Sequence, residues 1–269
     1  TSSIVTVSTV NTAIVGVYTI WYNVSDSSGN TAAELIRTVN VEDTTLPVIT
    51  LLGDNPVTIE VGSTYTDAGA TATDTYDGDI TSSIVTVSTV NTAIVGVYTV
   101  TYNVSDASGN EAAEVTRTIN VVDTTIPVIT LLGVAGTSVA VGDTYTDAGA
   151  TATDNYDGDI TSSIETVSNV DIAIVGTYTV IYDVVDANGN AAITVTRTVN
   201  VLDTTLPVIT LLGDNPATIE AGDTYTDAGA TATDTYDGDI TSSIVTISNV
   251  DTAIVGNYTV TYDVADANG

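Results

Sequence analysis

The chain has 269 residues with 34 acidic side chains and only three basic ones, and it contains no His, Cys, Met or Phe. Its net charge of −31 excludes nucleic acid and anionic membrane surfaces as partners, because both would repel it. Without Cys the chain can form no disulfides. Because the basic residues are all Arg, the His, Cys and Lys side chains that usually act as acid–base and nucleophilic groups in enzymes are also missing. We therefore predict a protein that is not an enzyme.

A near-perfect internal repeat organises the sequence. The phrase DTTLPVITLLG begins at Asp43, returns as DTTIPVITLLG at Asp123, and returns again at Asp203. Between Asp43–Gly109 and Asp203–Gly269, 57 of 67 aligned positions are identical. A period of this length with no helical pattern is typical of a string of small β domains. Copies this similar indicate that the number of repeats matters more than any single one.

The repeat divides the chain into four parts. Residues 1–42 correspond to the C-terminal part of a repeat, 43–122 and 123–202 are complete repeats, and 203–269 lacks the last strand. No initiator Met, signal peptide or anchor is recognisable, which predicts a segment of a longer chain. Two alternatives stay open: a fragment with arbitrary ends, or a last repeat that is completed by a strand from another chain.

About seven strands are predicted in the complete repeat 43–122. Apolar and β-branched runs separated by turn residues place them at 48–52, 57–60, 65–73, 80–88, 90–94, 97–105 and 113–121. The segment 74–79 is predicted to be a loop, because Asp and Gly favour turns. This pattern predicts an all-β immunoglobulin-like sandwich of two sheets. No apolar run approaches the roughly 20 residues of a membrane-spanning helix.

The strand at 97–105 shows the clearest alternation. Tyr98, Val100, Tyr102 and Val104 share one face, which we expect to be buried, and polar side chains occupy the other. The same alternation places Arg117 among apolar residues of the closing strand. We expect this side chain to form a structural ion pair with Asp67 or Glu60; the alternative is a bulge or strand edge that lets it reach water.

Taken together, these motifs resemble a known family. DTTLPVITLLG, VGSTYTDAGATATD, DGDIT, VGVYTVTYNVSDASGN and TRTINV, in this order, are similar to the tandem bacterial immunoglobulin-like domains of large surface adhesins and extracellular fibres, which are often found beside hyalin repeats. The resemblance covers the whole chain. It implies a β-sandwich used as an extracellular spacer or adhesive module at the cell surface, and it implies no catalytic residues.

A set of five Asp residues recurs in each repeat. In a sandwich, the linker before the first strand and two loops lie at the same pole, so their carboxylates are predicted to converge there. The predicted metal-binding residues are Asp43, Asp74, Asp77, Asp79 and Asp106, with the equivalents Asp123, Asp154, Asp157, Asp159 and Asp186, and Asp203, Asp234, Asp237, Asp239 and Asp266.

Calcium is the ion that this set favours. Crowded carboxylates repel one another unless a cation lies between them. Ca²⁺ accepts 6–8 oxygen ligands in flexible geometry, and the spacing is not that of an EF-hand. Ordinary turn and cap formation by Asp is the alternative explanation, and another ion is a third. A bound ion beside Asp43 would tie the linker to the body of one repeat.

Two classes of function remain after these exclusions. The first is a stalk or shaft segment of a long extracellular surface adhesin or fibre, with joints stiffened by Ca²⁺. The second is a multivalent module that binds glycans or surfaces through its repeated loops. Acidic loops that hardly vary favour the first. Its expected partners are Ca²⁺ and neighbouring repeats, and lateral or end-to-end self-association is left open.

Overall fold

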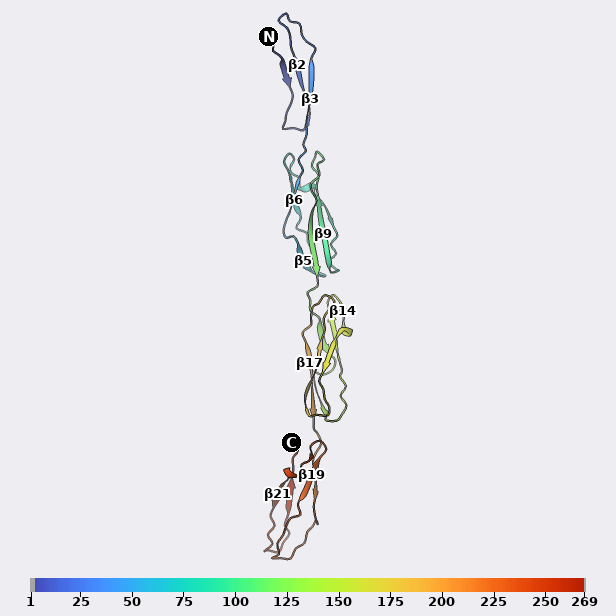
Figure 1. Cartoon of the computed structure of the whole chain (residues 1–269), viewed down its shortest axis with the longest axis vertical. Coiled ribbons are helices and arrows are strands. Elements are labelled where there is room, and N and C mark those ends of the chain that lie inside the picture. The colour runs from blue at the N-terminus through green and yellow to red at the C-terminus, as the bar shows by residue number, and fades with distance from the viewer. Residues whose placement is uncertain (1–2, 269) are drawn as a thin grey trace. The chain divides into compact units, whose positions relative to one another are not determined.

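The computed structural model describes residues 3–268 and consists of β strands and short 3-10 helices (Figure 1). It divides into two compact units, Thr1–Thr124 and Thr125–Gly269. None of the helices in the described residues has the length and apolar character needed to cross a bilayer.

The first unit holds the partial repeat 1–42 and the complete repeat 43–122. Its elements are β1 (Val5–Ser8), β2 (Gly16–Asn23), β3 (Leu35–Val41), β4 (Val48–Leu51), β5 (Val57–Glu60), β6 (Ala70–Asp74), β7 (Gly78–Asp79), η1 (Thr81–Ser83), β8 (Val85–Ser88), β9 (Gly96–Asn103) and β10 (Val115–Val122). Strands β1, β2 and β3 form one antiparallel sheet, whose exposed Leu35 lacks the facing sheet that covers the equivalent Val115 in the complete repeat.

The second unit holds the repeat 123–202 from Thr125 onward and the repeat that begins at Asp203. Its elements are β11 (Val128–Leu131), β12 (Gly136–Ala140), β13 (Ala150–Asp154), β14 (Gly158–Asp159), η2 (Thr161–Ser163), β15 (Glu165–Ser168), β16 (Gly176–Asp183), β17 (Val195–Leu202), β18 (Val208–Leu211), β19 (Ala230–Asp234), β20 (Gly238–Asp239), η3 (Thr241–Ser243), β21 (Val245–Ser248) and β22 (Val260–Asp263).

Each complete repeat is a sandwich of two sheets. In the repeat 43–122 one sheet has the order β4-β6-β7 and the other β5-β10-β9-β8. Strand β10 pairs antiparallel with β9 and parallel with β5. The predicted all-β fold of tandem immunoglobulin-like repeats is confirmed. In the last repeat, residues 217–220 align with β5 but form no strand, because the described residues include no counterpart of β10 for them to pair with.

Three predicted strands differ from the structure. The strand expected at 65–73 begins only at Ala70, because Gly69 has a left-handed φ of 79° and its N–H donates to Asp67 Oδ2 (3.1 Å). The run 80–88 opens with η1, where the Thr81 hydroxyl lies 3.0 Å from the backbone nitrogen of Ala72. Residues 90–94 turn instead of extending, and the Asn91 side chain accepts from Ala93 N–H.

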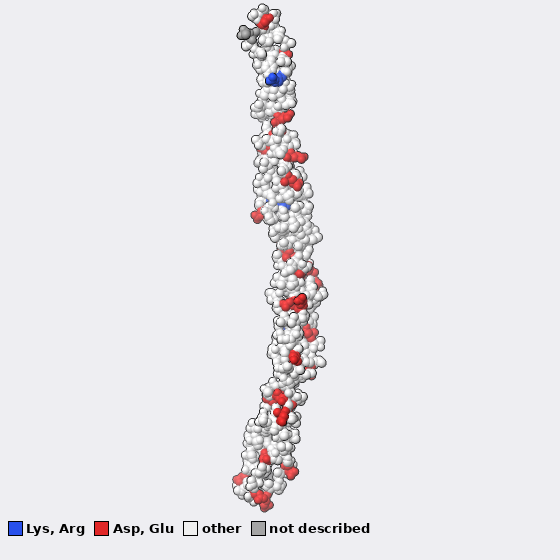
Figure 2. All heavy atoms as spheres, viewed as in Figure 1, with Lys and Arg blue, Asp and Glu red and all other residues white. Residues whose placement is uncertain are grey.

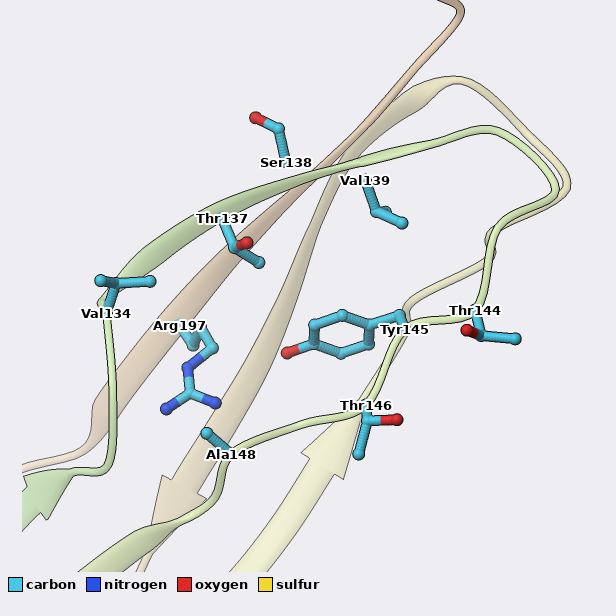
Figure 3. A pocket seen from close by; sticks show the side chains of 9 residues that line it. All are labelled: Val134, Thr137, Ser138, Val139, Thr144, Tyr145, Thr146, Ala148 and Arg197. Atoms are coloured by element: carbon cyan, nitrogen blue, oxygen red, sulfur yellow. The ribbon is translucent and has the colours of Figure 1, made fainter.

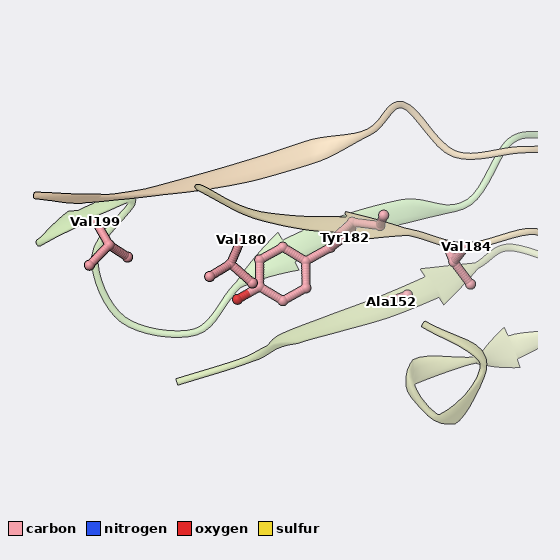
Figure 4. Close-up of a cluster of buried hydrophobic side chains, with 6 residues drawn as sticks. Ala152, Val180, Tyr182, Val184 and Val199 are labelled. Carbon is pink, nitrogen blue, oxygen red and sulfur yellow. The ribbon is translucent and has the colours of Figure 1, made fainter. Parts of the chain in front are cut away.

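The core is small and built from alternating residues of β9 and β10. Val100, Tyr102 and Val104 are at most 4% exposed, which confirms that this face of the strand is the inner one. Tyr98 is half-buried, and its hydroxyl donates to the carbonyl of Ile94 (2.9 Å), as in the tyrosine corner of immunoglobulin-like sandwiches. The repeat 123–202 has the same arrangement around Tyr182 (Figure 4). Since both repeats lack Phe, tyrosine rings provide the bulk of these cores.

A buried arginine joins the two sheets of each complete repeat. Arg117 on β10 is 1% exposed and pairs with Asp67, so the predicted ion pair is confirmed with Asp67 as the partner. Its guanidinium also donates to the carbonyls of Leu52 and Gly69 and to the hydroxyl of Tyr102. Arg197 and Asp147 repeat the pair. A buried charge is tolerated here because nearly all its donors have partners.

Tyrosine hydroxyls complete this network. Tyr102 and Tyr65 donate to the two oxygens of Asp67, at 2.6 and 2.9 Å. Burial and this bond to a carboxylate raise the pKa of Tyr102. Burial acts to raise the pKa of Asp67, but the hydrogen bonds from Tyr102 and Tyr65 and the charge of Arg117 outweigh it, so the pKa of Asp67 is lowered.

Arg117→Leu should strongly destabilise the repeat 43–122. The substitution leaves Asp67 without its cation and removes a donor from the Leu52 and Gly69 carbonyls, and breaking a buried pair in this way costs about 3–5 kcal/mol. Urea unfolding, followed by hydrogen exchange in β9 and β10, measures the loss. Arg37→Leu is the matched control, because Arg37 is exposed and should cost little. Equal effects at the two positions would contradict a structural role for the buried pair.

Acid should remove part of this stability. The folded pKa of Asp67 and of Asp147 lies below the value of about 4 in the unfolded chain, so their contribution is complete above pH ~4 and is lost as the pH falls below it. Urea midpoints measured with chelator at pH 7, 5 and 3 should fall mainly in the last step. The double variant Arg117→Leu/Arg197→Leu should show a smaller fall, and an unchanged acid dependence in that variant would exclude the pair as a cause.

Candidate metal centre

Four carboxylates from three segments meet at one pole of the repeat 43–122. Asp43 lies in the linker after β3, Asp74 ends β6, Asp77 lies in the β6–β7 turn, and Asp106 follows β9. Each offers an oxygen, and these oxygens all lie within 4.8 Å of one another. We call Asp43, Asp74, Asp77 and Asp106, with their equivalents, the acid cluster.

Backbone hydrogen bonds fix the loop residues 74–79, which we call the acid loop. Asp74 Oδ1 accepts from the N–H groups of Tyr76 (2.7 Å) and Asp77 (3.1 Å), which closes a turn around the carboxylate. Asp77 Oδ2 then accepts from the N–H of Ala107 (2.8 Å) in the next loop. The two loops that contribute ligands are therefore tied to each other.

The linker is tied to the same pole by two side chains. The Thr45 hydroxyl lies 2.6 Å from Asp43 Oδ1 and 3.1 Å from Asp74 Oδ2, so its one proton bridges linker and acid loop. The Asn110 side-chain amide donates to Asp106 Oδ2 (2.7 Å) and to the backbone carbonyl of Asp43 (3.1 Å). The linker thus belongs structurally to the repeat that follows it.

One oxygen of the cluster has no partner. Asp43 Oδ2 is shielded from solvent and makes no hydrogen bond, and the same holds for Asp203 Oδ2 in the last repeat and Asp154 Oδ2 in the repeat between. The whole Asp154 side chain is also buried, at 8% exposure. A charged oxygen without a partner in such a place costs several kcal/mol unless a cation lies beside it.

Two carboxylates of the cluster, Asp74 and Asp106, have lowered pKa values. Burial acts to raise the pKa of Asp74, but hydrogen bonds from the N–H groups of Asp77 and Tyr76 lower it overall. For Asp106, burial and the charge of Asp74 act to raise the pKa, and hydrogen bonds from Asn110 outweigh them. The sequence has no Lys or His, and in the described part of the chain Arg117 and Arg197 pair with Asp67 and Asp147 while Arg37 lies over the ring of Tyr22; acidic side chains far outnumber basic ones on the face in Figure 2.

The last repeat contains the same arrangement. Asp203, Asp234 and Asp237 have oxygens within 4.8 Å, and Thr205 bridges the first two at 2.6 and 3.0 Å. In the repeat 123–202, Asp154, Asp157 and Asp186 are close to one another in the same way. Their linker counterpart, Asp123, is the penultimate residue of the first unit.

Some predicted ligands do not join these groups. Asp79 is exposed, and its Oδ1 accepts from the N–H of Thr81 (2.9 Å), which closes a turn between β7 and η1. Asp159 and Asp239 make the same bond. The structure does not bring these three residues into the groups of close carboxylates, and their role as ligands stays a prediction. Asp266 is half-buried and lies outside the group formed by Asp203, Asp234 and Asp237.

Sequence reasoning also missed functional neighbours of the acid cluster. Thr45 and Asn110 carry no carboxylate, but their hydrogen bonds orient Asp43 and Asp106. Their signal was available, since a Thr follows each linker Asp by two positions and an Asn follows the predicted Asp106-type ligand by four in both complete repeats. Spacing alone could not reveal that one amide would bond to both the linker and the loop.

Nearly the whole chain matches the model of a known family. The model of the family described as bacterial surface protein, Ig-like domain matches residues 1–41, 49–121, 129–201 and 209–269. The chain belongs to this family. The resemblance stated from the motifs is thereby confirmed, and the repeats are bacterial surface immunoglobulin-like repeats.

Relatives place the same repeats in larger proteins. The chain is 32% identical over 286 residues to the pesticidal crystal protein Cry22Aa of Bacillus thuringiensis, covering 99% of this chain and 37% of that protein. It is 29% identical over 266 residues to hyalin of Strongylocentrotus purpuratus, covering 95% and 22%. It therefore spans well under half of either. The solved domains 4–9 of the surface layer protein SbsC cover 84% of this chain and 42% of that one, at 14% identity and a TM-score of 0.22.

Asn110→Ala should loosen the linker. The substitution removes the donor shared by Asp106 and the Asp43 carbonyl, and a hydrogen bond to a charged group contributes about 1.5–3 kcal/mol. Hydrogen exchange of residues 42–46 should become faster. In the control Asn30→Ala, the lost side-chain bond goes only to Asp26, so exchange in this linker should not change. Unaltered exchange in Asn110→Ala would show that this amide does not hold the linker.

Proposed function

We propose that this chain is a structural segment of an extracellular cell-surface adhesin or fibre, and that Ca²⁺ bound at the acid cluster stiffens the joints between its repeats. Membership of a family of bacterial surface domains supports the location. The strongest support for calcium binding is the shielded, unpartnered oxygen of Asp43 and of Asp203, because each lies on a linker within a group of carboxylates.

The donor set suits Ca²⁺. Carboxylate oxygens from three segments, without nitrogen or sulfur donors, match a hard cation, and the irregular spacing matches the flexible coordination of Ca²⁺ better than the strict octahedron of Mg²⁺. A divalent ion also offsets the repulsion among ionised groups that the protein cannot neutralise itself.

Stiffening follows from which segments supply the ligands. Without an ion, the linker at Asp43 is held to the following repeat by Thr45 and Asn110. An ion that binds Asp43 together with Asp74, Asp77 and Asp106 adds a bond from the linker to both loops. Rotation about the linker then requires loss of a metal ligand, so the linker stops acting as a hinge.

Glycan binding has one observation in its favour. A cavity of about 270 Å³ in the repeat 123–202 has Thr137, Ser138, Thr144, Tyr145 and Arg197 among its lining residues (Figure 3). Its rim residue Val134 stands where other repeats have Asp54 and Asp214. A multivalent binder needs equal sites in successive repeats. The acid cluster recurs with its bridging residues, so we favour the structural function.

Calcium should bind the full chain and stabilise it. Extracellular modules bind Ca²⁺ with Kd values of about 10⁻⁴–10⁻³ M, and calcium at 100 times its Kd raises the free energy of unfolding by about 2.7 kcal/mol per site. Isothermal titration calorimetry and urea unfolding, with Ca²⁺ and with chelator, measure both. Absence of binding at 10 mM Ca²⁺ would remove the basis of the proposal.

Asp77→Asn separates metal binding from turn formation. The amide oxygen can still accept from Ala107 N–H, so stability in chelator should change by less than about 1 kcal/mol. The calorimetric titration should show one site fewer than the wild type. Asp54→Asn is the control, because Asp54 is exposed in a turn outside the cluster and should leave the number of sites unchanged.

A further inference from the structure

A tyrosine on the acid loop contacts the preceding repeat. Tyr76 lies between the cluster residues Asp74 and Asp77, and its hydroxyl accepts from the N–H of Val15 at 3.1 Å. Tyr236, between Asp234 and Asp237, accepts from the N–H of Val175 at 3.1 Å. Each contact lies within one of the two units, and each joins a repeat to the one before it.

The partner surface is the turn that precedes the long central strand. This turn has the sequence Ala-Ile-Val-Gly in every repeat. Val15 is 38% exposed beneath the contact, and Val175 is half-buried. Val255 occupies the equivalent position without a following repeat among the described residues, and it is 88% exposed. Val15 and Val175, whose N–H groups bond to the tyrosine of the following repeat, are thus less exposed than Val255.

Tyrosine and acid cluster share one turn. The N–H of Tyr76 donates to Asp74 Oδ1 at 2.7 Å, and the N–H of Tyr236 donates to Asp234 Oδ1 at 2.7 Å. The direction in which the ring leaves the backbone is therefore set by the conformation of a carboxylate in the cluster. Repulsion among the carboxylates acts on this turn whenever no cation is bound.

We propose that Tyr76 and Tyr236 form the interface between neighbouring repeats, and that it closes when a divalent cation binds the acid cluster. The inference rests on the proposed function and extends it from the linker to the bodies of both repeats. The ion holds Asp74 and Asp77 in place, the turn between them presents the Tyr76 hydroxyl, and the hydroxyl and ring hold the Val15 turn. Calcium then fixes the angle between repeats as well as the linker.

Spin labels on the full chain test the interface. The protein has no Cys, so Thr166→Cys and Thr246→Cys give two unique labels on exposed positions of β15 and β21, on either side of one joint. Pulsed dipolar spectroscopy then compares the width of the distance distribution in Ca²⁺ and in EGTA. We expect the distance distribution of the labelled wild type to be roughly two-fold narrower in Ca²⁺ than in EGTA, because binding selects one arrangement of the joint.

Two substitutions and a control separate the interface from the metal site. Tyr236→Ala keeps the N–H that Asp234 accepts, so calcium binding by calorimetry should stay within about two-fold, while the distribution stays broad in Ca²⁺. Tyr236→Phe keeps the ring and should have an intermediate width. Tyr258→Phe removes a hydroxyl whose bond to the Ile254 carbonyl lies within one repeat, so it should match the wild type.

The outcomes distinguish the two proposals. Failure of the wild type to bind Ca²⁺ in calorimetry overturns the proposed function. Normal binding with a Tyr236→Ala distribution as narrow as that of the wild type overturns the interface alone. A wild type that is equally narrow in EGTA and in Ca²⁺ overturns control by the cation, whatever the substitutions do.

Discussion

Repulsion between ionised carboxylates is the constraint that organises each repeat. Four of them approach within 4.8 Å, hydrogen bonds hold Asp74 and Asp106 in the charged form, and the sequence provides no positive side chain to offset them. The arrangement is tolerable only if something outside the chain supplies positive charge. Because the carboxylates come from a linker and two loops, that source also controls how the linker is held.

In the core of the repeat, by contrast, the chain itself neutralises a half-buried carboxylate. In the core, Asp67 has its own cation in Arg117 and two tyrosine donors, and the pair joins both sheets without any external ligand. Each complete repeat therefore has a centre neutralised by its own arginine and a pole that is left negative. This division explains how the fold forms without disulfides and with small apolar residues, while the joint remains open to regulation by solution conditions.

The sequence predicted features that depend on period and alternation. The repeat, the buried face of Val100 and Tyr102, the pair of Arg117 with an acid, and the proximity of Asp43, Asp74 and Asp106 all follow from strand geometry and from which loops share a pole. Local side-chain bonding was not visible at that level. Asp79 accepts from the N–H of Thr81 and lies outside the cluster, and the left-handed Gly69 makes β6 begin later than predicted. The contact of Tyr76 depends on the preceding repeat, which no pattern within a single repeat reveals.

The position of the buried arginine has a consequence for how such a chain acquires its structure. Arg117 lies on the closing strand, fifty positions after Asp67, so no repeat can complete its centre until its final segment is available. Every repeat uses the same acid and the same base, and chemistry alone does not tell an arginine which aspartate is its own. Pairing within one repeat is favoured only because the two residues are closer along the chain, which makes the loop between them easier to close. Near-identical neighbours therefore carry a built-in risk of exchanging closing strands during folding, and emergence of one repeat at a time limits it.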